Sequence, residues 1–371
     1  MSLQALRARL EKRRAGLRAM PVAVVAGGGS SEREVSLVSG SAVADALAHA
    51  GYSAHLLPVS LDDVSIDCAL AGGGAERALP PGAEKAAAEP QPAGGEMALW
   101  DPGALVSRLR DSGVVFTTMH GSRGENGAWQ GLLELIGVPY VSAGVKGSAL
   151  GMDKLISKYV FERLGVPTPR FWVARGGTRV RQDVPPEIAE LVAKPTDQGS
   201  SVGIEMVSND EAGWRRVEEL LLQYDPLLIE ERIHGRELTA AVIGHSTEPM
   251  ALPLVEIKPK RGFYDYQAKY TAGQSEYVCP ADVPESLVVR VQGHAKTVYR
   301  EFDLEPYARI DLLLDEQGAP WFLEANTLPG FTPLSLLPRA ARAAGIEFGE
   351  LLELLMLCAV ERAEHRRRPP Q

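Results

Sequence analysis

Residues 22–52, VAVVAGGGSSEREVSLVSGSAVADALAHAGY, predict the fold of the first part of this chain. An apolar run of Val and Ala ends in three glycines, and the segment after them repeats its apolar residues with a period near 3.6. This pattern predicts a buried strand, a glycine turn and a helix, which together make a βα unit. Such units assemble into parallel sheets, so we expect an α/β domain that begins here.

The pattern continues on the C-terminal side of that unit. Further strands are predicted within residues 53–59 and 113–121, and a helix followed by a short strand within 127–144. Residues 69–97 are rich in Ala, Gly, Pro and Glu with little periodicity, and this composition predicts a flexible surface insertion. We therefore expect a first α/β domain over residues 21–143, Rossmann-like in character.

Two more units follow in the sequence. One helix is predicted over 147–165, then a strand at 170–175 and two strands around a small-residue loop within 190–207. Residues 226–244 begin another strand-rich segment, and the helix predicted at 348–366 ends it. We place a central domain at 144–229, a C-terminal domain at 230–362 and a tail at 363–371. The predicted fold class is mixed α/β with three domains.

Composition excludes several classes of protein. The chain of 371 residues is 45% apolar and has no uncharged run near the roughly 20 residues that a membrane-spanning helix needs. A formal charge of -9 argues against a nucleic-acid partner, because such binding needs clustered Lys and Arg. Three widely separated cysteines without metal-binding spacing are typical of a reducing compartment, so we expect a cytoplasmic protein.

The first twenty residues, MSLQALRARLEKRRAGLRAM, are basic and helix-prone but lack the apolar centre of a secretory signal. Two interpretations are open: a solvated leading helix, which we prefer, or an Arg-rich targeting peptide. We leave this N-terminal extension, residues 1–20, out of the predicted fold.

A loop and three lysines indicate phosphate binding. In KPTDQGSSVG, residues 194–203, small residues between two predicted strands leave backbone N–H groups open to an anion. An ordinary hairpin would give the same pattern. Lys154, Lys194 and Lys269 each stand beside a candidate loop or strand end, where an ammonium group can meet phosphate oxygens. Taken singly, each could equally be a solvated surface lysine.

Acidic and amide side chains form the strongest constellation. A period of two puts Arg309 and Asp311 on one face of the predicted strand YARIDLLLD, and Glu324 and Asn326 on one face of FLEAN. If these strands are neighbours, hard oxygen ligands converge at one place, as Mg²⁺ with nucleotide phosphates requires. The segment LLIEERIHGRE could add an adenine site after Glu230, although alone it predicts only a strand and a turn.

The order of these segments resembles the D-alanine:D-alanine ligases of the ATP-grasp superfamily. The resemblance covers nearly all of residues 22–360, and it rests on these motifs: GGGSSEREVSLVSG, HGSRGENGAWQGLLELIGVPY, SALGMDK, KPTDQGSSVG, IEERIHGRE, FYDYQAKY, ARIDLLLD and EANTLPGFTPLS. It implies three domains of the ATP-grasp fold, with ATP held between the second and third. It also implies a carboxylate activated as an acyl phosphate.

The resemblance assigns cofactor-binding roles to particular residues. Two Mg²⁺ ions, with Mn²⁺ as an alternative, would be held by Asp311, Glu324 and Asn326. Glu230 and the backbone near Ile233 would hold adenine, and Glu237 the ribose. The phosphates would be bound by Lys154, Lys194, Lys269, Ser200 and Ser201.

It assigns the amino-acid sites in the same way. Glu34 would pair with the ammonium of the first D-alanine, with His120 in the same pocket. Arg309 and the Gly330 N–H would stabilise the tetrahedral oxyanion, because such donors act where charge develops. The carboxylate of the second D-alanine would meet Ser335 and the Leu336 backbone. Tyr270 would close over the site through a hydrogen-bond network with Glu237 and Ser200.

The expected reaction is therefore ATP-dependent formation of D-alanyl-D-alanine for peptidoglycan, by a homodimer without a membrane or nucleic-acid partner. By the same resemblance, the segment YDYQAKY favours an amine as the second substrate, because this segment differs in relatives that use D-lactate. The alternative is D-lactate, D-serine or a specialised amino acid. A nucleotide-binding protein without activity is a third hypothesis. The sequence departs from the family pattern at Asn126, at Gln198 and in YVSAG, and none of these positions is a predicted metal ligand.

Overall fold

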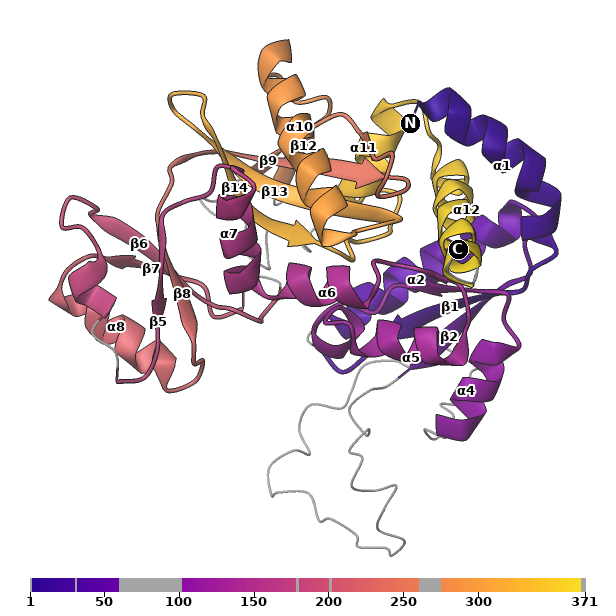
Figure 1. The fold of residues 1–371 in the computed structure, drawn as a ribbon, viewed down its shortest axis with the longest axis horizontal. Coiled ribbons are helices and arrows are strands. Elements are labelled where there is room, and N and C mark those ends of the chain that lie inside the picture. The colour runs from indigo at the N-terminus through magenta and orange to yellow at the C-terminus, as the bar shows by residue number, and fades with distance from the viewer. Residues whose placement is uncertain are drawn as a thin grey trace, which may run out of the picture.

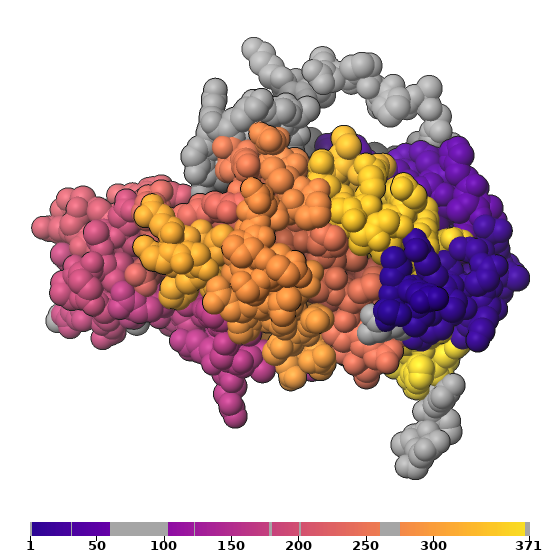
Figure 2. Space-filling model, turned by 90° about the horizontal axis from the view of Figure 1, so that it is seen from above, coloured from indigo at the N-terminus to yellow at the C-terminus, as the bar shows by residue number. Residues whose placement is uncertain are grey.

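The computed structural model describes residues 2–30, 32–59, 102–177, 180–199, 202–259 and 275–367. Three sheets follow one another along the chain and lie side by side in the molecule (Figure 1). The sheet within residues 171–231 lies at one end, the sheet within residues 235–326 in the middle and the N-terminal sheet at the other end (Figure 1). The colours of Figure 2 show the same order of residues along the molecule. The predicted insertion at 69–97 lies outside the described residues.

The N-terminal sheet is parallel, with strand order β2-β1-β3-β4, as the βα pattern predicts. Every residue of β1 is buried, which explains its unbroken apolar run. The strands of this sheet are β1 (Val22–Gly27), β2 (Ala54–Val59), β3 (Val114–Thr117) and β4 (Tyr140–Val141). The helical segments of this part of the chain are α2 (Arg33–His49), α4 (Pro102–Arg110), η2 (Ser122–Gly124) and α5 (Ala128–Ile136).

The central sheet is antiparallel, with strand order β5-β8-β6-β7. Its strands are β5 (Phe171–Ala174), β6 (Glu190–Pro195), β7 (Glu205–Ser208) and β8 (Leu227–Glu231). The helical segments beside it are α6 (Val145–Met152), α7 (Lys154–Arg163), η3 (Val180–Asp183) and α8 (Glu211–Leu221). The boundary expected between residues 229 and 230 falls inside β8, so we propose that the central unit extends through Glu231.

The third sheet has the order β12-β11-β9-β13-β14, with β10 paired to β9. All of its strand pairs are antiparallel. Its strands are β9 (Gly235–Ile243), β10 (Met250–Ala251), β11 (Val255–Pro259), β12 (Ser275–Val278), β13 (Tyr307–Asp315) and β14 (Pro320–Asn326). The helices that follow in the C-terminal part are α10 (Glu285–Phe302), α11 (Leu336–Ala343) and α12 (Phe348–Arg366), so a mixed α/β class is confirmed.

One predicted helix is in fact two. The helix expected over 147–165 is broken at Asp153, whose extended backbone ends α6. The Asp153 carboxylate then accepts a hydrogen bond from the Ile156 N–H at 3.0 Å and caps α7. Because an aspartate cap satisfies the first N–H groups of a helix, it favours a new start at this point. The break puts Lys154 in the first turn of α7.

The N-terminal helix α1 (Leu3–Arg18) corrects the exclusion of residues 1–20 from the fold. Its buried Leu6, Leu10 and Leu17 belong to the same apolar cluster as α12 and β1. Figure 1 shows α1 packed beside α12. The helix looks solvated in the sequence because its leucines form only one narrow stripe among arginines. Its packing partner lies more than three hundred residues away: the Arg7 Nε bonds the Glu350 Oε1 at 2.6 Å.

Helix α12 connects the N-terminal and C-terminal parts of the molecule. Its residues from Leu351 through Arg362 are buried, and the Arg362 guanidinium donates to the carbonyls of Tyr140, Ser142 and Glu305 at 2.8, 2.9 and 2.6 Å. The helix continues to Arg366, into the segment predicted as a tail, and Arg366 pairs with Glu134. No helix in the described ranges is long and apolar enough to cross a membrane.

A buried charge cluster holds α1 to this core and predicts a pH effect. Burial lowers the pKa of His245, but hydrogen bonds with Cys358, Glu305 and Glu361 outweigh it and raise the pKa to about 11. The Arg9 guanidinium reaches the same Glu361 carboxylate at 2.5 Å. Because the pKa is raised on folding, the stabilisation is complete below the ordinary pKa of about 6.5. This stabilisation by the protonated His245 is lost as the pH rises toward the pKa of His245 in the folded protein.

We therefore expect His245→Gln to lower the free energy of unfolding by about 1–3 kcal/mol at pH 6.5. The difference from the parent protein should shrink at pH 10. Urea titrations at both pH values measure it, with the exposed His49→Gln as a control. A deficit of equal size at both pH values would contradict a protonated His245.

Candidate functional site

The predicted pairing of the two polar strands is confirmed. Strands β13 and β14 are antiparallel neighbours, and their register puts Arg309 opposite Asn326 and Asp311 opposite Glu324. The register shifts immediately after Asp311, where the strand pairing is irregular. All four predicted side chains therefore lie at one end of this strand pair.

Arg309 and Asp311 form a fixed unit. The Arg309 Nε and Nη2 donate to the two Asp311 oxygens at 2.8 and 2.9 Å, a bidentate pair. The Thr239 hydroxyl on β9 donates to the Asp311 Oδ1 at 2.6 Å, and Asp311 itself is buried. Thr239 is a functional candidate that sequence reasoning missed, because only the β9–β13 pairing puts it opposite Asp311.

Two cavities meet at this strand end. The larger cavity, of about 660 Å³, extends from the first turns of α2 to α11, and the smaller, of about 390 Å³, lies between the central and third sheets. Lys154, Arg309 and Glu324 line both. The Lys154 Nζ lies 3.5 Å from the Glu324 Oε2 and donates to the Gln198 carbonyl at 2.6 Å. The shared wall is thus rich in charge of both signs.

The smaller cavity contains the predicted nucleotide residues Lys194, Glu230, Ile233 and Glu237. Glu230 is buried between Lys194 and Lys158 and pairs with both. Burial raises the pKa of Glu230, but the charges of the two lysines outweigh it and lower the pKa. Lys158 was not predicted as a site residue, since a helix position near the middle of α7 gives no signal of a buried ion pair.

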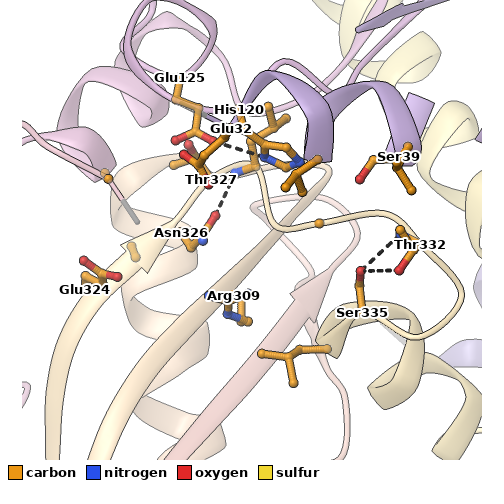
Figure 3. Close-up of a pocket in the computed structure, with 18 of the residues that line it drawn as sticks. Glu32, Ser39, His120, Glu125, Arg309, Glu324, Asn326, Thr327, Thr332 and Ser335 are labelled. Atoms are coloured by element: carbon orange, nitrogen blue, oxygen red, sulfur yellow. Dashed lines mark hydrogen bonds and ion pairs between the residues drawn. The ribbon is translucent and has the colours of Figure 1, made fainter. Parts of the chain in front are cut away.

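Carboxylates and a histidine gather at one end of the larger cavity (Figure 3). The buried His120 lies with its Nδ1 3.5 Å from the Glu125 Oε1. Burial lowers the pKa of His120, but Glu125 outweighs it, with a smaller contribution from Glu32, and the pKa is raised. The buried Nε2 of His120 has no hydrogen-bond partner among the described residues. A ligand in this cavity could accept from it.

Two acids of the motif SSEREVS line this cavity, in different environments. Glu34 was the predicted residue, and its side chain is 85% exposed and 3.8 Å from Arg33. Glu32, which was not predicted, is buried at the start of α2. The two acids differ in sequence position by only two residues, so the local pattern could not show which would be buried.

Ser335 lies away from His120 in the larger cavity (Figure 3), and Gly330 lines the same cavity. The Thr332 N–H donates to the Ser335 Oγ at 3.1 Å, and the two hydroxyls are 2.8 Å apart. Ser335 and Leu336 begin α11. A side chain at Gly330 would crowd the Ser335 Oγ, which a Cβ atom would approach to 3.1 Å. The absence of a Cβ therefore keeps this hydroxyl accessible.

Two of the departures from the family pattern, Asn126 and Gln198, have local explanations. The Asn126 Oδ1 accepts from the Ala128 N–H at 3.1 Å, a turn bond that an aspartate could make equally well. Gln198 contacts Lys154 through its carbonyl, so that contact does not depend on the side chain. Four predicted site residues lie outside the described ranges: Ser200, Ser201, Lys269 and Tyr270.

The three predicted metal ligands lie on two adjacent strands. In the described part of the chain, no three His, Cys, Asp or Glu side chains cluster as a metal site. Asp311 lines the smaller cavity, Asn326 the larger and Glu324 both, from positions that pair near one strand end. The Asn326 Oδ1 accepts from the Leu328 N–H at 3.1 Å. Carboxylate and amide oxygens with room for phosphate fit Mg²⁺. Asp311 would have to share its oxygens with Arg309.

Comparisons with known proteins agree with this arrangement. The family profile described as "D-ala D-ala ligase N-terminus" matches residues 21–143, and "D-ala D-ala ligase C-terminus" matches residues 160–357. D-alanine–D-alanine ligase from Pelotomaculum thermopropionicum is 37% identical over 362 residues, which cover 94% of this chain and 99% of the relative. The enzyme of the same name from Bordetella avium is 38% identical, with 89% and 92% covered.

Solved structures give the same result for the fold. D-alanine–D-alanine ligase from Bacillus anthracis complexed with ATP has a TM-score of 0.71 at 24% identity and covers 94% of this chain and 99% of its own. The ligase from Coxiella burnetii has a TM-score of 0.70 and covers 94% and 97%. The three-domain ATP-grasp fold expected from the sequence is therefore confirmed.

Proposed function

The chain belongs to the D-alanine–D-alanine ligase family, and from this premise we propose that it joins two D-alanines into D-alanyl-D-alanine, converting ATP into ADP and phosphate. The dipeptide is a precursor of peptidoglycan. The observation that carries the proposal is the junction of two cavities at Lys154, Arg309 and Glu324. A nucleotide in the smaller cavity would direct its terminal phosphate at an amino acid in the larger one.

ATP in the smaller cavity would meet residues of both adjoining sheets. The ionised Glu230 can accept a hydrogen bond from the adenine amino group, and Glu237 lies on the same cavity wall for the ribose. Lys154 and Lys194 would neutralise the phosphates as point charges. Lys158, paired with Glu230, would keep that carboxylate ionised and in place.

The chemistry requires a leaving group. An amine cannot displace oxide from a carboxylate, so one oxygen of the first D-alanine attacks the terminal phosphorus of ATP, and ADP leaves. The ammonium of the second D-alanine gives up a proton, and the resulting neutral amine attacks the acyl carbon and loses a further proton as the amide forms. Phosphate departs from the resulting tetrahedral intermediate and carries away the oxygen that was phosphorylated.

The residues at the junction of the two cavities would assist these reaction steps through their charges and by positioning the substrates. Carboxylates at one end of the larger cavity balance the ammonium of the first D-alanine, while Arg309 and the Gly330 N–H face the developing oxyanion. Asp311, Glu324 and Asn326 would hold Mg²⁺, which neutralises phosphate charge when bound. By the same family resemblance, we propose a homodimer.

The test is product analysis after incubation with ATP, Mg²⁺ and equal concentrations of D-alanine, D-serine and D-lactate. D-alanyl-D-alanine should dominate, because product ratios in competition report relative kcat/KM. L-alanine should release no phosphate above background. The absence of dipeptide would contradict the proposed function, and a dominant ester with D-lactate would contradict the amine preference.

A further inference from the structure

The first turn of α11 leaves donors open beside the larger cavity. Ser335 precedes the helix and makes no capping bond through its side chain. Within the described part of the chain, the N–H groups of Leu336 and Leu337 have no hydrogen-bond partner, and Pro338 has no N–H. Such open groups at the start of a helix favour an anion. By themselves they do not define what the anion is.

Arg339 supplies an independent observation at the same place. Its backbone N–H donates to the Ser335 carbonyl at 2.9 Å, so Arg339 lies one turn below the serine, and it lines the same cavity. Its guanidinium carbon lies 5.0 Å from the centre of the Tyr277 ring. This contact with an aromatic ring from β12 restrains a long side chain that would otherwise be free to move.

The polar contacts of the Arg339 guanidinium are incomplete. The Nη2 donates to the Leu334 carbonyl at 3.4 Å, and the buried Nε has no partner among the residues that the structure describes. No carboxylate in those ranges pairs with Arg339. By contrast, Arg236 makes two bonds of 2.8 Å to Glu256. Because a buried donor without an acceptor is destabilising, Arg339 is better suited to a bound anion.

We propose that Arg339 is a specificity-determining residue that binds the carboxylate of the second amino acid, together with Ser335 and the Leu336 N–H. The proposal rests on the proposed ligase function and deepens it. The amine of the second substrate must face the acyl carbon near Arg309 and Gly330, so its carboxylate must lie elsewhere in the cavity. The basic α11 end provides a place for it, opposite the acidic end near His120.

A guanidinium group selects for a carboxylate by charge and shape. It donates in a planar fork that matches a carboxylate, whereas a carboxamide has no charge and only one acceptor oxygen. The enzyme should therefore discriminate between D-alanine and D-alaninamide as the attacking amine. Their amino groups and methyl side chains are alike, so this pair of substrates isolates the contact.

The experiment is a competition between the two amines. The parent protein, Arg339→Met, Arg339→Lys and Arg342→Met receive ATP, Mg²⁺, D-alanine and D-alaninamide, and mass spectrometry quantifies D-alanyl-D-alanine and D-alanyl-D-alaninamide. Arg342 is an exposed residue of the same helix and serves as the matched control. Arg339→Met should lower the ratio of dipeptide to amide product by about 10–100-fold, the usual effect of losing a bond to a charged group.

The other variants and the kinetics complete the test. Arg339→Lys should keep part of the discrimination, and Arg342→Met all of it. In Arg339→Met the KM for the second D-alanine should rise while kcat at saturation stays within about threefold, because the contact serves binding rather than chemistry. If Arg339→Met does not fold, Arg339→Gln in the same competition gives the measurement.

The outcomes separate this inference from the ligase function. An unchanged product ratio in Arg339→Met, or an equal loss of both products, would overturn the inference and leave Arg339 as a packing partner of Tyr277. Such a result would leave the proposed function intact, since the parent protein would still make dipeptide. A parent protein that makes neither product would overturn the proposed function itself, and the role of Arg339 with it.

Discussion

Replacing Arg309 by alanine should lower kcat by about 10²–10³, the usual effect of losing one oxyanion donor. The guanidinium lines both cavities, at the place where the nucleotide and the amino acid would meet. Its two bonds to Asp311 fix its orientation before any substrate binds. A donor held in this way needs no reorganisation as negative charge develops.

Initial rates of phosphate release, with ATP and D-alanine varied separately, measure the effect. We expect a fall in kcat with smaller changes in the two KM values, because the interaction is strongest in the transition state. Circular dichroism and a thermal melt should show an intact fold. Arg300→Ala, at an exposed position near the end of α10, is the control. Normal turnover by Arg309→Ala would refute the oxyanion assignment.

Replacing Glu324 by alanine should be at least as damaging and should lower kcat by about 10³, as expected when several kcal/mol of charge stabilisation are lost. Glu324 faces Asp311 across the strand pair and lies at the junction of the cavities. If it is a metal ligand, the variant should also require more Mg²⁺ for half-maximal rate. That second effect separates ligation from a general disturbance of the site.

Phosphate release across a Mg²⁺ titration gives both quantities. Glu316→Ala is the matched control, because Glu316 lies exposed in the turn that joins the same two strands. It should change neither kcat nor the Mg²⁺ requirement. A Glu324→Ala protein with parental kcat and an unchanged Mg²⁺ midpoint would show that Glu324 is not a ligand.

The meeting of the polar residues of β13 and β14 was predictable, because the period of a strand shows which of its side chains share a face. A period of two put Arg309 with Asp311 and Glu324 with Asn326, and the observed register brings both pairs together. The parallel N-terminal sheet was likewise predicted from a sequence pattern, an apolar run followed by a glycine turn and a helix. Both predictions rest on patterns of neighbouring residues, and such patterns are visible in a single sequence.

The features that were not predicted depend on contacts between residues far apart in the sequence, and a local sequence pattern does not show such contacts. Lys158 looks like any helical lysine until β8 places Glu230 beside it, and Thr239 gains a role only through the pairing of β9 with β13. Helix α1 looks solvated until α12 covers its leucines. Burial of Glu32 in place of Glu34 likewise depends on how α2 begins against the residues around His120.

If the two cavities carry out one reaction through an acyl phosphate, one oxygen atom passes from the carboxylate of D-alanine to the released phosphate, and oxygen-18 labelling follows this transfer. D-alanine labelled with oxygen-18 in its carboxylate would be incubated with unlabelled ATP and Mg²⁺, and mass spectrometry would follow both products. The predicted result is one labelled oxygen in each phosphate released per dipeptide formed. Dipeptide accompanied by unlabelled phosphate would contradict transfer of phosphate to the carboxylate, and with it the role given to the junction at Lys154, Arg309 and Glu324.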